Sequence, residues 1–252
     1  DGKLKLPKIK SLIQMKYSRK VRGDILTATI TRNNGNQYFV SINVKNSPVK
    51  CLKKTGQKVG IDLGLKDLST FSNGFKTGKI HLKEIDQKIR RQNQILSIKV
   101  KNGCNYVKAK TKLNRLYQKK KDIINDFLHK TTTQIVREFD EIYVGNVNNQ
   151  LGLKNKYLAK TTVDQHWFEF KRQLKYKSDW YRKYFEVVDE KYTSKTCSNC
   201  GYVTTSLDLN IRQWTCTSCN TIHDRDVNAA CNILTVGTTG LAFNKTNKKL
   251  VD

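Results

Sequence analysis

Four cysteines near the C-terminus constrain the fold of this chain more than any other feature. They have the spacing Cys197-x2-Cys200-x15-Cys216-x2-Cys219. Each Cys-x2-Cys pair can turn two thiolates toward one metal ion, and two such pairs complete a tetrahedron. The spacing therefore predicts a zinc ribbon, with an iron–sulfur cluster as the less favoured alternative. Because four thiolates leave no open coordination position, we expect the Zn²⁺ to be structural.

The other three cysteines are scattered along the chain, at Cys51, Cys104 and Cys231. An odd number of cysteines with two close pairs suits a reducing compartment and a metal site better than a disulfide framework. His223 follows the fourth cysteine of the ribbon pattern. We expect it to pack or to form hydrogen bonds rather than to bind the metal.

Charge indicates the class of partner. The chain has 48 Lys and Arg against 21 Asp and Glu, a formal net charge of +27. Such an excess predicts a polyanionic partner, and nucleic acid is the leading candidate. No long apolar run is present, so we expect no membrane association. The chain begins with Asp1 and its one methionine is Met15, so we expect it to be part of a longer protein.

The order of expected elements predicts an α/β fold. Two alternating runs at 25–32 and 37–44, joined by Asn-Asn-Gly-Asn, predict a β-hairpin. Further strands are expected at 59–65, 68–71, 141–144 and 185–190. Apolar residues recur with helical spacing over 81–138, and a break near Asn102-Gly103 predicts a helical hairpin. A helix is also expected over 164–184, with Trp167, Phe168 and Trp180 in the core and base stacking as their less favoured alternative role. A last helix is expected over 226–234.

Two aspartates lie in contexts that suggest catalysis. Asp62 is set in the apolar strand Val59–Leu65, and Asp226 starts the last helix. A carboxylate in an apolar strand is costly to bury unless something pairs with it, and a metal ion would do so. Alternatively, Asp62 is a strand-end residue that accepts backbone hydrogen bonds, and Asp226 is a helix N-cap. Together, the two acids favour a two-metal Mg²⁺ nuclease site, which requires about three converging carboxylates.

Four stretches carry a resemblance to a known family: Gly60-Ile-Asp-Leu-Gly-Leu65, Phe170-Lys-Arg-Gln-Leu-Lys-Tyr-Lys177, Tyr192-Thr-Ser-Lys-Thr-Cys-Ser-Asn-Cys-Gly201 and His223-Asp-Arg-Asp-Val-Asn-Ala-Ala230. In this order they resemble the C-terminal two-thirds of the TnpB proteins, the transposon-encoded RNA-guided nucleases, and of their Fanzor relatives. The smallest type V CRISPR effectors share the same core.

The resemblance implies an RNase H-like (RuvC) domain with a helical insertion and a zinc-ribbon insert, preceded by part of a wedge β-barrel. The implied boundaries are 1–58 for the end of the wedge, 59–190 for the nuclease domain with its helical hairpin, 191–222 for the target-nucleic-acid-binding zinc ribbon, and 223–252 for the last RuvC helix and tail. An omega-type guide RNA and a target DNA are the implied partners.

One position departs from the family pattern. The usual second catalytic acid is a glutamate of the form Ile-Glu-Asp-Leu-Asn, where this chain has Tyr143-Val-Gly145-Asn-Val147. Gly145 cannot bind a metal. Either the nuclease is dead and the protein is an RNA-guided DNA-binding repressor, or another acid has taken over, as in the branch that includes Fanzors. Glu190 fits that placement, because it shares a strand face with Val188 while Asp189 points away.

The favoured reading is therefore an Mg²⁺-dependent, RNA-guided DNA endonuclease with Asp62, Glu190 and Asp226 as metal ligands. The alternatives are the nuclease-dead repressor and a guide-independent DNA-binding accessory protein of transposition. We expect the protein in the nucleoid-containing cytoplasm of a bacterium or in the nucleus of a eukaryote. Expected phosphate contacts are made by basic residues spread over several segments: Lys119, Lys120, Lys121, Lys171, Arg172, Lys175, Lys195 and Arg225.

Overall fold

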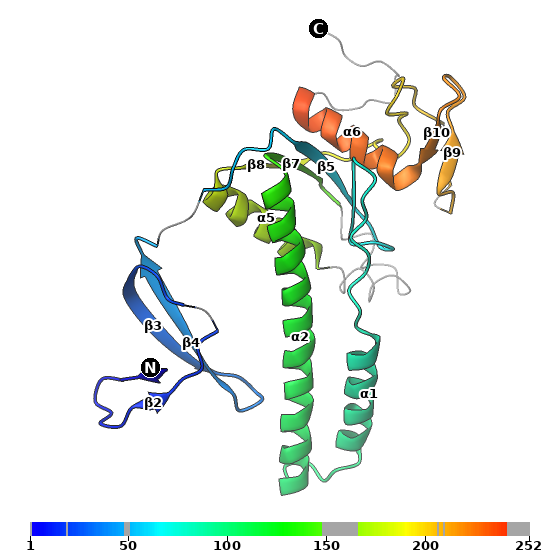
Figure 1. The fold of residues 1–252 in the computed structure, drawn as a ribbon. Coiled ribbons are helices and arrows are strands. Elements are labelled where there is room, and N and C mark those ends of the chain that lie inside the picture. The colour runs from blue at the N-terminus through cyan, green and yellow to red at the C-terminus, as the bar shows by residue number, and fades with distance from the viewer. Residues whose placement is uncertain are drawn as a thin grey trace. The chain divides into compact units, whose positions relative to one another are not determined.

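A computed structural model of the chain describes residues 2–18, 20–47, 51–147, 166–205, 207–208 and 210–240. The chain divides into two compact units, residues 1–50 and residues 51–252. Figure 1 shows the elements of each unit. Among the described residues, no helix is both long and apolar enough to cross a membrane.

The first unit is built around one β-hairpin. Its strands are β1 (Lys3–Leu4), β2 (Ile13–Gln14), β3 (Asp24–Arg32) and β4 (Tyr38–Lys45). Strands β3 and β4 pair antiparallel, as the sequence predicts. Asn33 fixes the turn, because its side-chain oxygen accepts hydrogen bonds from the backbone N–H groups of Gly35 and Gln37, each at 2.9 Å. Every residue of β3 is exposed, and the described part of this unit forms two separate two-stranded ladders.

The second unit contains a four-stranded mixed sheet in the order β6-β5-β7-β8. Its strands are β5 (Lys58–Leu63), β6 (Ser69–Phe71), β7 (Glu141–Gly145) and β8 (Tyr184–Val188). Strands β5, β7 and β8 are parallel, and β6 returns antiparallel to β5. The carboxyl ends of three parallel strands therefore meet at one edge, which is where open α/β sheets bind ligands.

Four helices and a small hairpin complete the described part of this unit. They are α1 (Lys83–Ser97), α2 (Cys104–Glu138), α5 (Trp167–Tyr181), α6 (Arg225–Thr239), β9 (Gln213–Thr215) and β10 (Ile222–Asp224). The helices α1 and α2 run side by side (Figure 1) as the expected hairpin, with its break at residues 98–103. Helix α5 is shorter than expected because Arg182 adopts a left-handed conformation that ends it. Strand β8 ends at Val188, two residues before Glu190.

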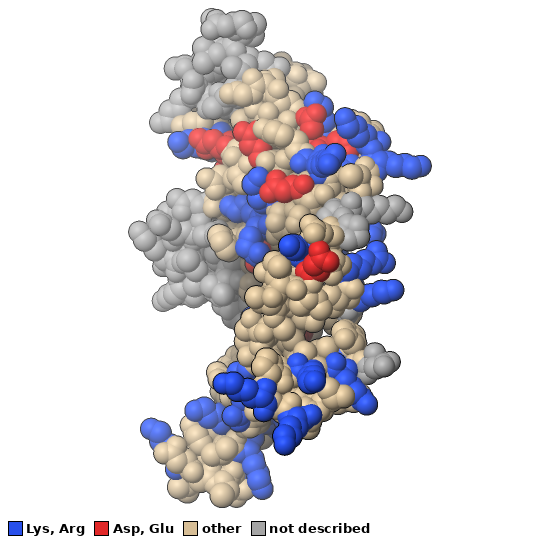
Figure 2. All heavy atoms as spheres, turned by 90° about the vertical axis from the view of Figure 1, so that its left-hand side faces the viewer, with Lys and Arg blue, Asp and Glu red and all other residues tan. Residues whose placement is uncertain are grey.

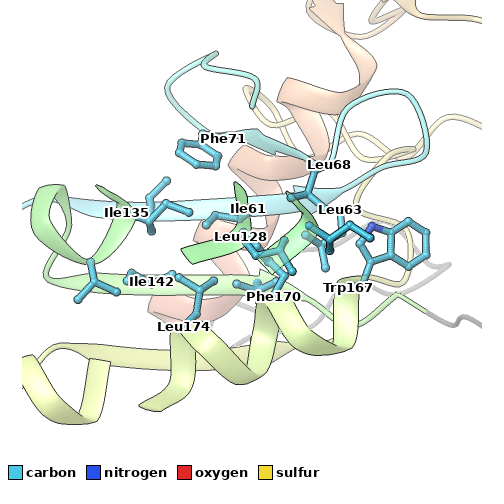
Figure 3. Close-up of a cluster of buried hydrophobic side chains, with 14 of the residues drawn as sticks. Ile61, Leu63, Leu68, Phe71, Leu128, Ile135, Ile142, Trp167, Phe170 and Leu174 are labelled. Atoms are coloured by element: carbon cyan, nitrogen blue, oxygen red, sulfur yellow. The ribbon is translucent and has the colours of Figure 1, made fainter. Parts of the chain in front are cut away.

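One face of the sheet carries the main core. The odd-numbered residues of β5 and the even-numbered residues of β7 point to it, and they pack against α2 and α5. Figure 3 shows Ile61, Ile142, Leu128 and Phe170 meeting in this cluster. All four side chains are fully buried. Since their neighbours along each strand point the other way, Gly60, Asp62, Tyr143 and Gly145 face the opposite side of the sheet.

Helix α6 covers that opposite face. A Cβ at Gly60 would collide with the carbonyl oxygen of Ala230 in α6, and a Cβ at Gly237 would collide with the ring of Tyr143. The two glycines therefore let the helix lie directly on β5 and β7. Ile233 and Val236 pack against Tyr143 and Val188 to form a second, smaller core. This close approach brings the first turn of α6 to the carboxyl edge of the sheet.

Helix α5 contradicts part of the expected core. Trp167 is buried as predicted, whereas Phe168 and Trp180 are exposed, so the prediction for these two was wrong. Polar residues share the buried face of the helix with Phe170 and Leu174. Lys177 donates hydrogen bonds to the backbone oxygen of His129 at 2.9 Å and to the Thr132 hydroxyl at 2.6 Å. A polar seam between α2 and α5 therefore takes the space that the aromatic side chains were expected to fill.

Candidate active site and metal centre

Asp62 is the penultimate residue of β5. Its neighbours Ile61 and Leu63 point into the main core and are buried. Because side chains alternate along a strand, Asp62 points to the face that α6 covers. Pairing of Ile61 with Val144 in the parallel neighbour puts Asp62 level with Gly145 at the end of β7. The first expected acid therefore lies at the carboxyl edge of the sheet.

The carboxylate of Glu190 lies over Gly145. Strand pairing brings Gly145 opposite Val188, and Glu190 follows two residues later. A Cβ at Gly145 would lie 2.9 Å from the Glu190 Oε2 atom and 3.5 Å from its Cβ. The missing side chain at position 145 is what leaves room for the glutamate. A carboxylate supplied from the end of β8 thus occupies the space where a side chain on β7 would begin.

Asp226 lies in the first turn of α6. The alternative role of N-cap belongs to Asp224, whose side chain accepts hydrogen bonds from the backbone N–H groups of Asp226 and Val227, both at 3.0 Å. The capping carboxylate also forms an ion pair of 2.9 Å with Lys76. Asp226 itself contacts Arg212 at 3.2 Å. The Asp226 carboxylate is thus left out of the cap and close to the strand edge.

The three acids influence one another electrostatically. Burial, together with the nearby charges of Glu190 and Asp226, raises the pKa of Asp62 to about 8, although Arg225 lowers it in part. Burial also raises the pKa of Glu190, which Lys171 partly offsets. Carboxylates that are buried close together cannot all ionise without a compensating cation. The site therefore favours either protons or bound cations.

The spacing of these acids differs from that of a single-ion site. Among the described residues, only the four cysteines form a group of at least three potential ligands whose atoms all lie within 4.8 Å of one another. The carboxylates of Asp62, Glu190 and Asp226 are therefore spread more widely. A site with two Mg²⁺ ions roughly 4 Å apart, each about 2.1 Å from its ligand oxygens, does not require all three carboxylates to meet at one point. Oxygen donors are also the ligand type that Mg²⁺ prefers.

The cysteine tetrad has the geometry of a zinc site. The Sγ atoms of Cys197 and Cys219 are 3.6 Å apart, and those of Cys200 and Cys216 are 3.7 Å apart. A tetrahedral site with Zn–S bonds of about 2.3 Å requires S···S distances of roughly 3.8 Å. All seven cysteines are free of disulfides. The four side chains therefore fit one structural Zn²⁺.

Neighbouring groups shift the pKa values of two of the four thiols. Hydrogen bonds from the Thr221 hydroxyl and backbone N–H lower the pKa of Cys219 to about 5. Burial instead raises the pKa of the Cys197 thiol, but the Nε2 atom of buried His223 lies 3.0 Å from that sulfur. His223 also packs against the ring of Trp214, with centroids 4.9 Å apart. The histidine thus lies beside the tetrad as a hydrogen-bonding and packing residue.

Two asparagines that the sequence analysis did not single out join the zinc module to α6. Asn232 donates to the backbone oxygens of Thr193 at 2.7 Å and Thr196 at 2.6 Å. Asn228 donates to Thr196 at 2.7 Å and accepts from the Ser198 N–H at 2.9 Å. Both amides are buried. Two asparagines four residues apart on an otherwise apolar helix face are the signal that could have predicted this connection.

The expected nucleic-acid contacts are distributed over several elements. Lys119, Lys120 and Lys121 lie on α2, Lys171, Arg172 and Lys175 lie on α5, Lys195 precedes the first cysteine, and Arg225 opens α6. Several are already ion-paired within the protein, including Lys120 with Asp86 at 3.0 Å and Lys175 with Asp179 at 3.1 Å. Lysine and arginine side chains form several patches on the face shown in Figure 2, and acidic side chains lie among those of its upper part.

Comparisons with known proteins identify the family. A family described as "Probable transposase" matches residues 41–155, and "Cas12f1-like, TNB domain" matches residues 167–233. A Streptomyces pristinaespiralis protein named "Putative RNA-guided DNA endonuclease" is 35% identical over 94% of this chain. A "TnpB-like protein" of Acanthamoeba polyphaga mimivirus is 30% identical over 89% of it. This chain belongs to the TnpB family.

The TnpB-family chain spans only part of these relatives. It covers 60% of the Streptomyces protein and 46% of the mimivirus protein. Among solved structures, its fold is similar to that of the protein in the Cas12f1–sgRNA–target DNA complex. That match has a TM-score of 0.52 and 18% sequence identity, and covers 81% of this chain and 55% of the other. The similarity assigns this TnpB-family chain a mixed α/β fold of the Cas12f type.

Proposed function

We propose that this protein is an RNA-guided DNA endonuclease of the TnpB type, with a RuvC-like, RNase H-like site that depends on Mg²⁺. The names of its relatives and the nucleic acids in the similar Cas12f1 complex support this activity and its partners. The formal net charge of +27 supports a polyanionic substrate. Such a function requires access to genomic DNA, in the nucleoid of a bacterium or the nucleus of a eukaryote.

Asp62, Glu190 and Asp226 supply the oxygen ligands of the site. Their mutual repulsion and burial, which raise the pKa of Asp62 to about 8, support a role in cation binding. Bound Mg²⁺ ions supply the activation of a water molecule and the stabilisation of the leaving 3′ oxygen. Asp62 gives up its proton when cations bind, and Lys171 and Arg212 balance the remaining negative charge at the edges of the site.

The observation that carries the proposal is the contact between Glu190 and Gly145. The glutamate carboxylate fills the space beside Gly145, 2.9 Å from where a Cβ would lie. The position of Glu190 is set by β8, whose last residue, Val188, pairs with Gly145 of β7. The loss of an acid on β7 is thereby compensated by an acid from the neighbouring strand end, so the number of carboxylates at the site is restored.

The zinc module braces the nucleic acid beside the site. Structural Zn²⁺ held by Cys197, Cys200, Cys216 and Cys219 keeps the two knuckles folded. Asn228 and Asn232 fasten the first knuckle to the helix that carries Asp226. Movement of the module and movement of the catalytic acid are therefore linked through α6. A guide RNA supplies sequence recognition by base pairing, while the protein contacts the backbone.

Cleavage of a labelled DNA matched to the co-purified RNA tests the proposal, with the full-length protein and with or without Mg²⁺. We expect Mg²⁺-dependent cleavage. Glu190→Gln keeps the side-chain size but removes the charge, and should reduce the cleavage rate by at least about 100-fold while guide-dependent DNA binding persists. Asp189→Asn is the matched control, because Asp189 is exposed and adjacent. Cleavage by Glu190→Gln at the wild-type rate would remove this residue from the mechanism.

A second function is supported by Gly145 itself. The protein would then be an RNA-guided DNA-binding repressor in which the lost carboxylate is not replaced. Guide-dependent DNA binding without Mg²⁺-dependent cleavage would support it. DNA binding without any co-purified RNA would instead support a guide-independent accessory protein of transposition.

A further inference from the structure

Helix α5 has an inverted distribution of side chains. Phe168 is 74% exposed and Trp180 is 56% exposed, while Gln173 and Lys177 are buried. Exposed aromatic rings contribute little to folding, and burial of a lysine without an acidic partner is costly. A helix that exposes aromatic side chains and buries polar ones is expected where its surface has a binding role.

Three exposed side chains and the half-buried Tyr176 lie along one side of the helix. Phe168, Arg172, Tyr176 and Trp180 are spaced by four residues, so successive members are neighbours on the helix surface. The rings of Tyr176 and Trp180 have centroids 4.7 Å apart. The Arg172 guanidinium carbon lies 5.4 Å from the centre of the Tyr176 ring. We call this row of four planar groups the α5 ladder.

Arg172 is held in place rather than left to move freely. Its Nε and Nη2 atoms donate to the two carboxylate oxygens of Glu169, at 2.7 Å and 2.8 Å. The side chain remains 54% exposed. More than half of the side-chain surface therefore remains open to solvent, and the pairing with Glu169 lowers the entropy that a ligand would otherwise have to offset.

The ladder continues into a basic groove. Arg172 also lines an open depression of about 660 Å³ between α2 and α5, together with Tyr117, Lys120 and Lys121. Lys120 forms an ion pair with Asp86, and Lys121 is exposed. A row of planar groups next to clustered ammonium groups matches the two parts of a nucleotide, since bases stack on planar groups and phosphates pair with cations.

We propose that the α5 ladder and this groove bind an unpaired stretch of nucleic acid, with bases stacked on the ladder and phosphates turned toward the lysines. The inference rests on the proposed function, which supplies single-stranded RNA or displaced DNA. A protein partner fits less well, because the row contains no aliphatic side chain and because lysines, which are depleted in protein interfaces, border it. Stacking does not depend on base identity, so the site holds strands without reading their sequence.

Binding of short labelled oligonucleotides to the purified full-length chain tests the site, in Mg²⁺-free buffer where hydrolysis does not occur. Oligo-dT and oligo-U are compared with an abasic strand of equal length, which has the same charge but no bases. We expect tighter binding of the strands with bases. Trp180→Leu should weaken their binding by about 5- to 100-fold, and change abasic binding by less than about twofold. The ratio of oligo-U to oligo-dT binding distinguishes an RNA from a DNA occupant.

Two matched variants separate stacking from other effects. Trp180→Phe keeps a ring and should retain most of the binding, whereas Leu keeps only apolar surface. Arg172→Lys keeps the charge but loses the plane, and should weaken oligo-dT more than the abasic strand. Equal binding of oligo-dT and the abasic strand by the wild-type chain would overturn the inference. The inference would also be overturned if the Trp180→Leu variant bound the oligonucleotides as tightly as the wild type does. Self-association of the chain through this face, with oligonucleotide binding unchanged, would overturn it as well.

These outcomes are distinguishable from failure of the proposed function. Loss of Mg²⁺-dependent cleavage with an intact difference between oligo-dT and the abasic strand would refute the nuclease and leave the ladder standing. Mg²⁺-dependent cleavage together with equal binding of oligo-dT and the abasic strand would support the nuclease and refute the α5 ladder. Absence of binding to every strand, abasic included, would count against both.

Discussion

Asp62→Asn should make the metal-free protein more stable at alkaline pH although it removes a proposed ligand. The folded-state pKa of Asp62 is about 8, against 3.8 for an unperturbed aspartate, and burial is the largest cause. Between these values the folded chain keeps a proton that the unfolded chain has lost. The stability that this proton contributes is complete below pH 4, falls steadily between pH 4 and pH 8, and is lost once the pH has risen through the folded-state pKa.

The magnitude follows from the shift. Four pKa units at about 1.36 kcal/mol each give an upper limit of roughly 5 to 6 kcal/mol, and relaxation of the site on ionisation reduces it. Asparagine is neutral at every pH. Because the unfolded aspartate is already about two pH units above its pKa at pH 6.0, the upper limit there is about 3 kcal/mol. We therefore expect the variant to be more stable than the wild type by about 1 to 3 kcal/mol at pH 6.0 and by about 2 to 5 kcal/mol at pH 8.5.

Urea unfolding followed by tryptophan fluorescence is the assay. All three tryptophans, Trp167, Trp180 and Trp214, belong to the unit of residues 51–252, so the signal excludes the β3–β4 hairpin. The buffer contains no Mg²⁺, and it contains no chelator, so that Zn²⁺ stays bound. Protons compete with Zn²⁺ for the cysteines, but this effect is the same in the variant and in the wild type and cancels in the comparison. Adding Mg²⁺ at pH 8.5 should stabilise the wild type and have little effect on Asp62→Asn.

Asp126→Asn on α2 is the control. Its carboxylate is exposed and pairs with Lys130, so the change should affect stability by less than about 1 kcal/mol at both pH values. An Asp62→Asn variant that is no more stable than the wild type at pH 8.5 would refute the reasoning. It would mean that the carboxylate is already compensated within the protein and has no need of a cation.

Three further predictions concern single substitutions. Gly145→Ala should slow single-turnover cleavage by about 10- to 100-fold, since its Cβ would displace the Glu190 carboxylate; unchanged cleavage would show that Glu190 needs no such room. Cys200→Ser should reduce bound zinc measured by atomic absorption from about one ion per chain to nearly none, and full retention would contradict the tetrad. Asp140→Ala should destabilise the chain by about 3 to 5 kcal/mol in urea unfolding, because it leaves buried Lys183 unpaired; a change below about 1 kcal/mol would contradict this.

Local patterns were sufficient to predict several elements. The Asn-Asn-Gly-Asn turn gives the β3–β4 hairpin, because Asn33 caps its own turn and Asn36 adopts a positive φ of 59°. The spacing of the cysteines brings four sulfurs together, since each pair is followed by a residue in the left-handed conformation, Gly201 and Asn220. In the hairpin turn and within each Cys-x2-Cys pair, the interactions that determine the structure lie within a few residues of one another.

Helix α5 shows why the rest could not be predicted. Its helical period was visible, but the period does not tell which face is inward. The partner helix α2 offers Thr132, Thr133 and backbone oxygens at the contact, so the Lys177 ammonium is the group that finds acceptors there. Aromatic residues at 168 and 180 were assigned to the core on hydrophobicity alone. Only the tertiary partner, which lies about forty residues away in sequence, decides the outcome.

Prediction of the site itself required both the local strand pattern and the tertiary contacts. Alternation along β8 predicts that Glu190 shares a face with Val188, but the strand ends at Val188 and alternation alone does not fix a residue beyond it. The position of the Glu190 carboxylate is determined by the space that is left beside Gly145. Ile233 of α6 lies 2.9 Å from where a Gly145 Cβ would be, and the Glu190 Oε2 atom lies at the same distance. Because α6 closes one side of this space, a side chain at 145 and the Glu190 carboxylate cannot both fit without movement. Glycine at 145 and glutamate at 190 are therefore coupled, and Gly145→Glu in the presence of Glu190 should crowd the site rather than repair it.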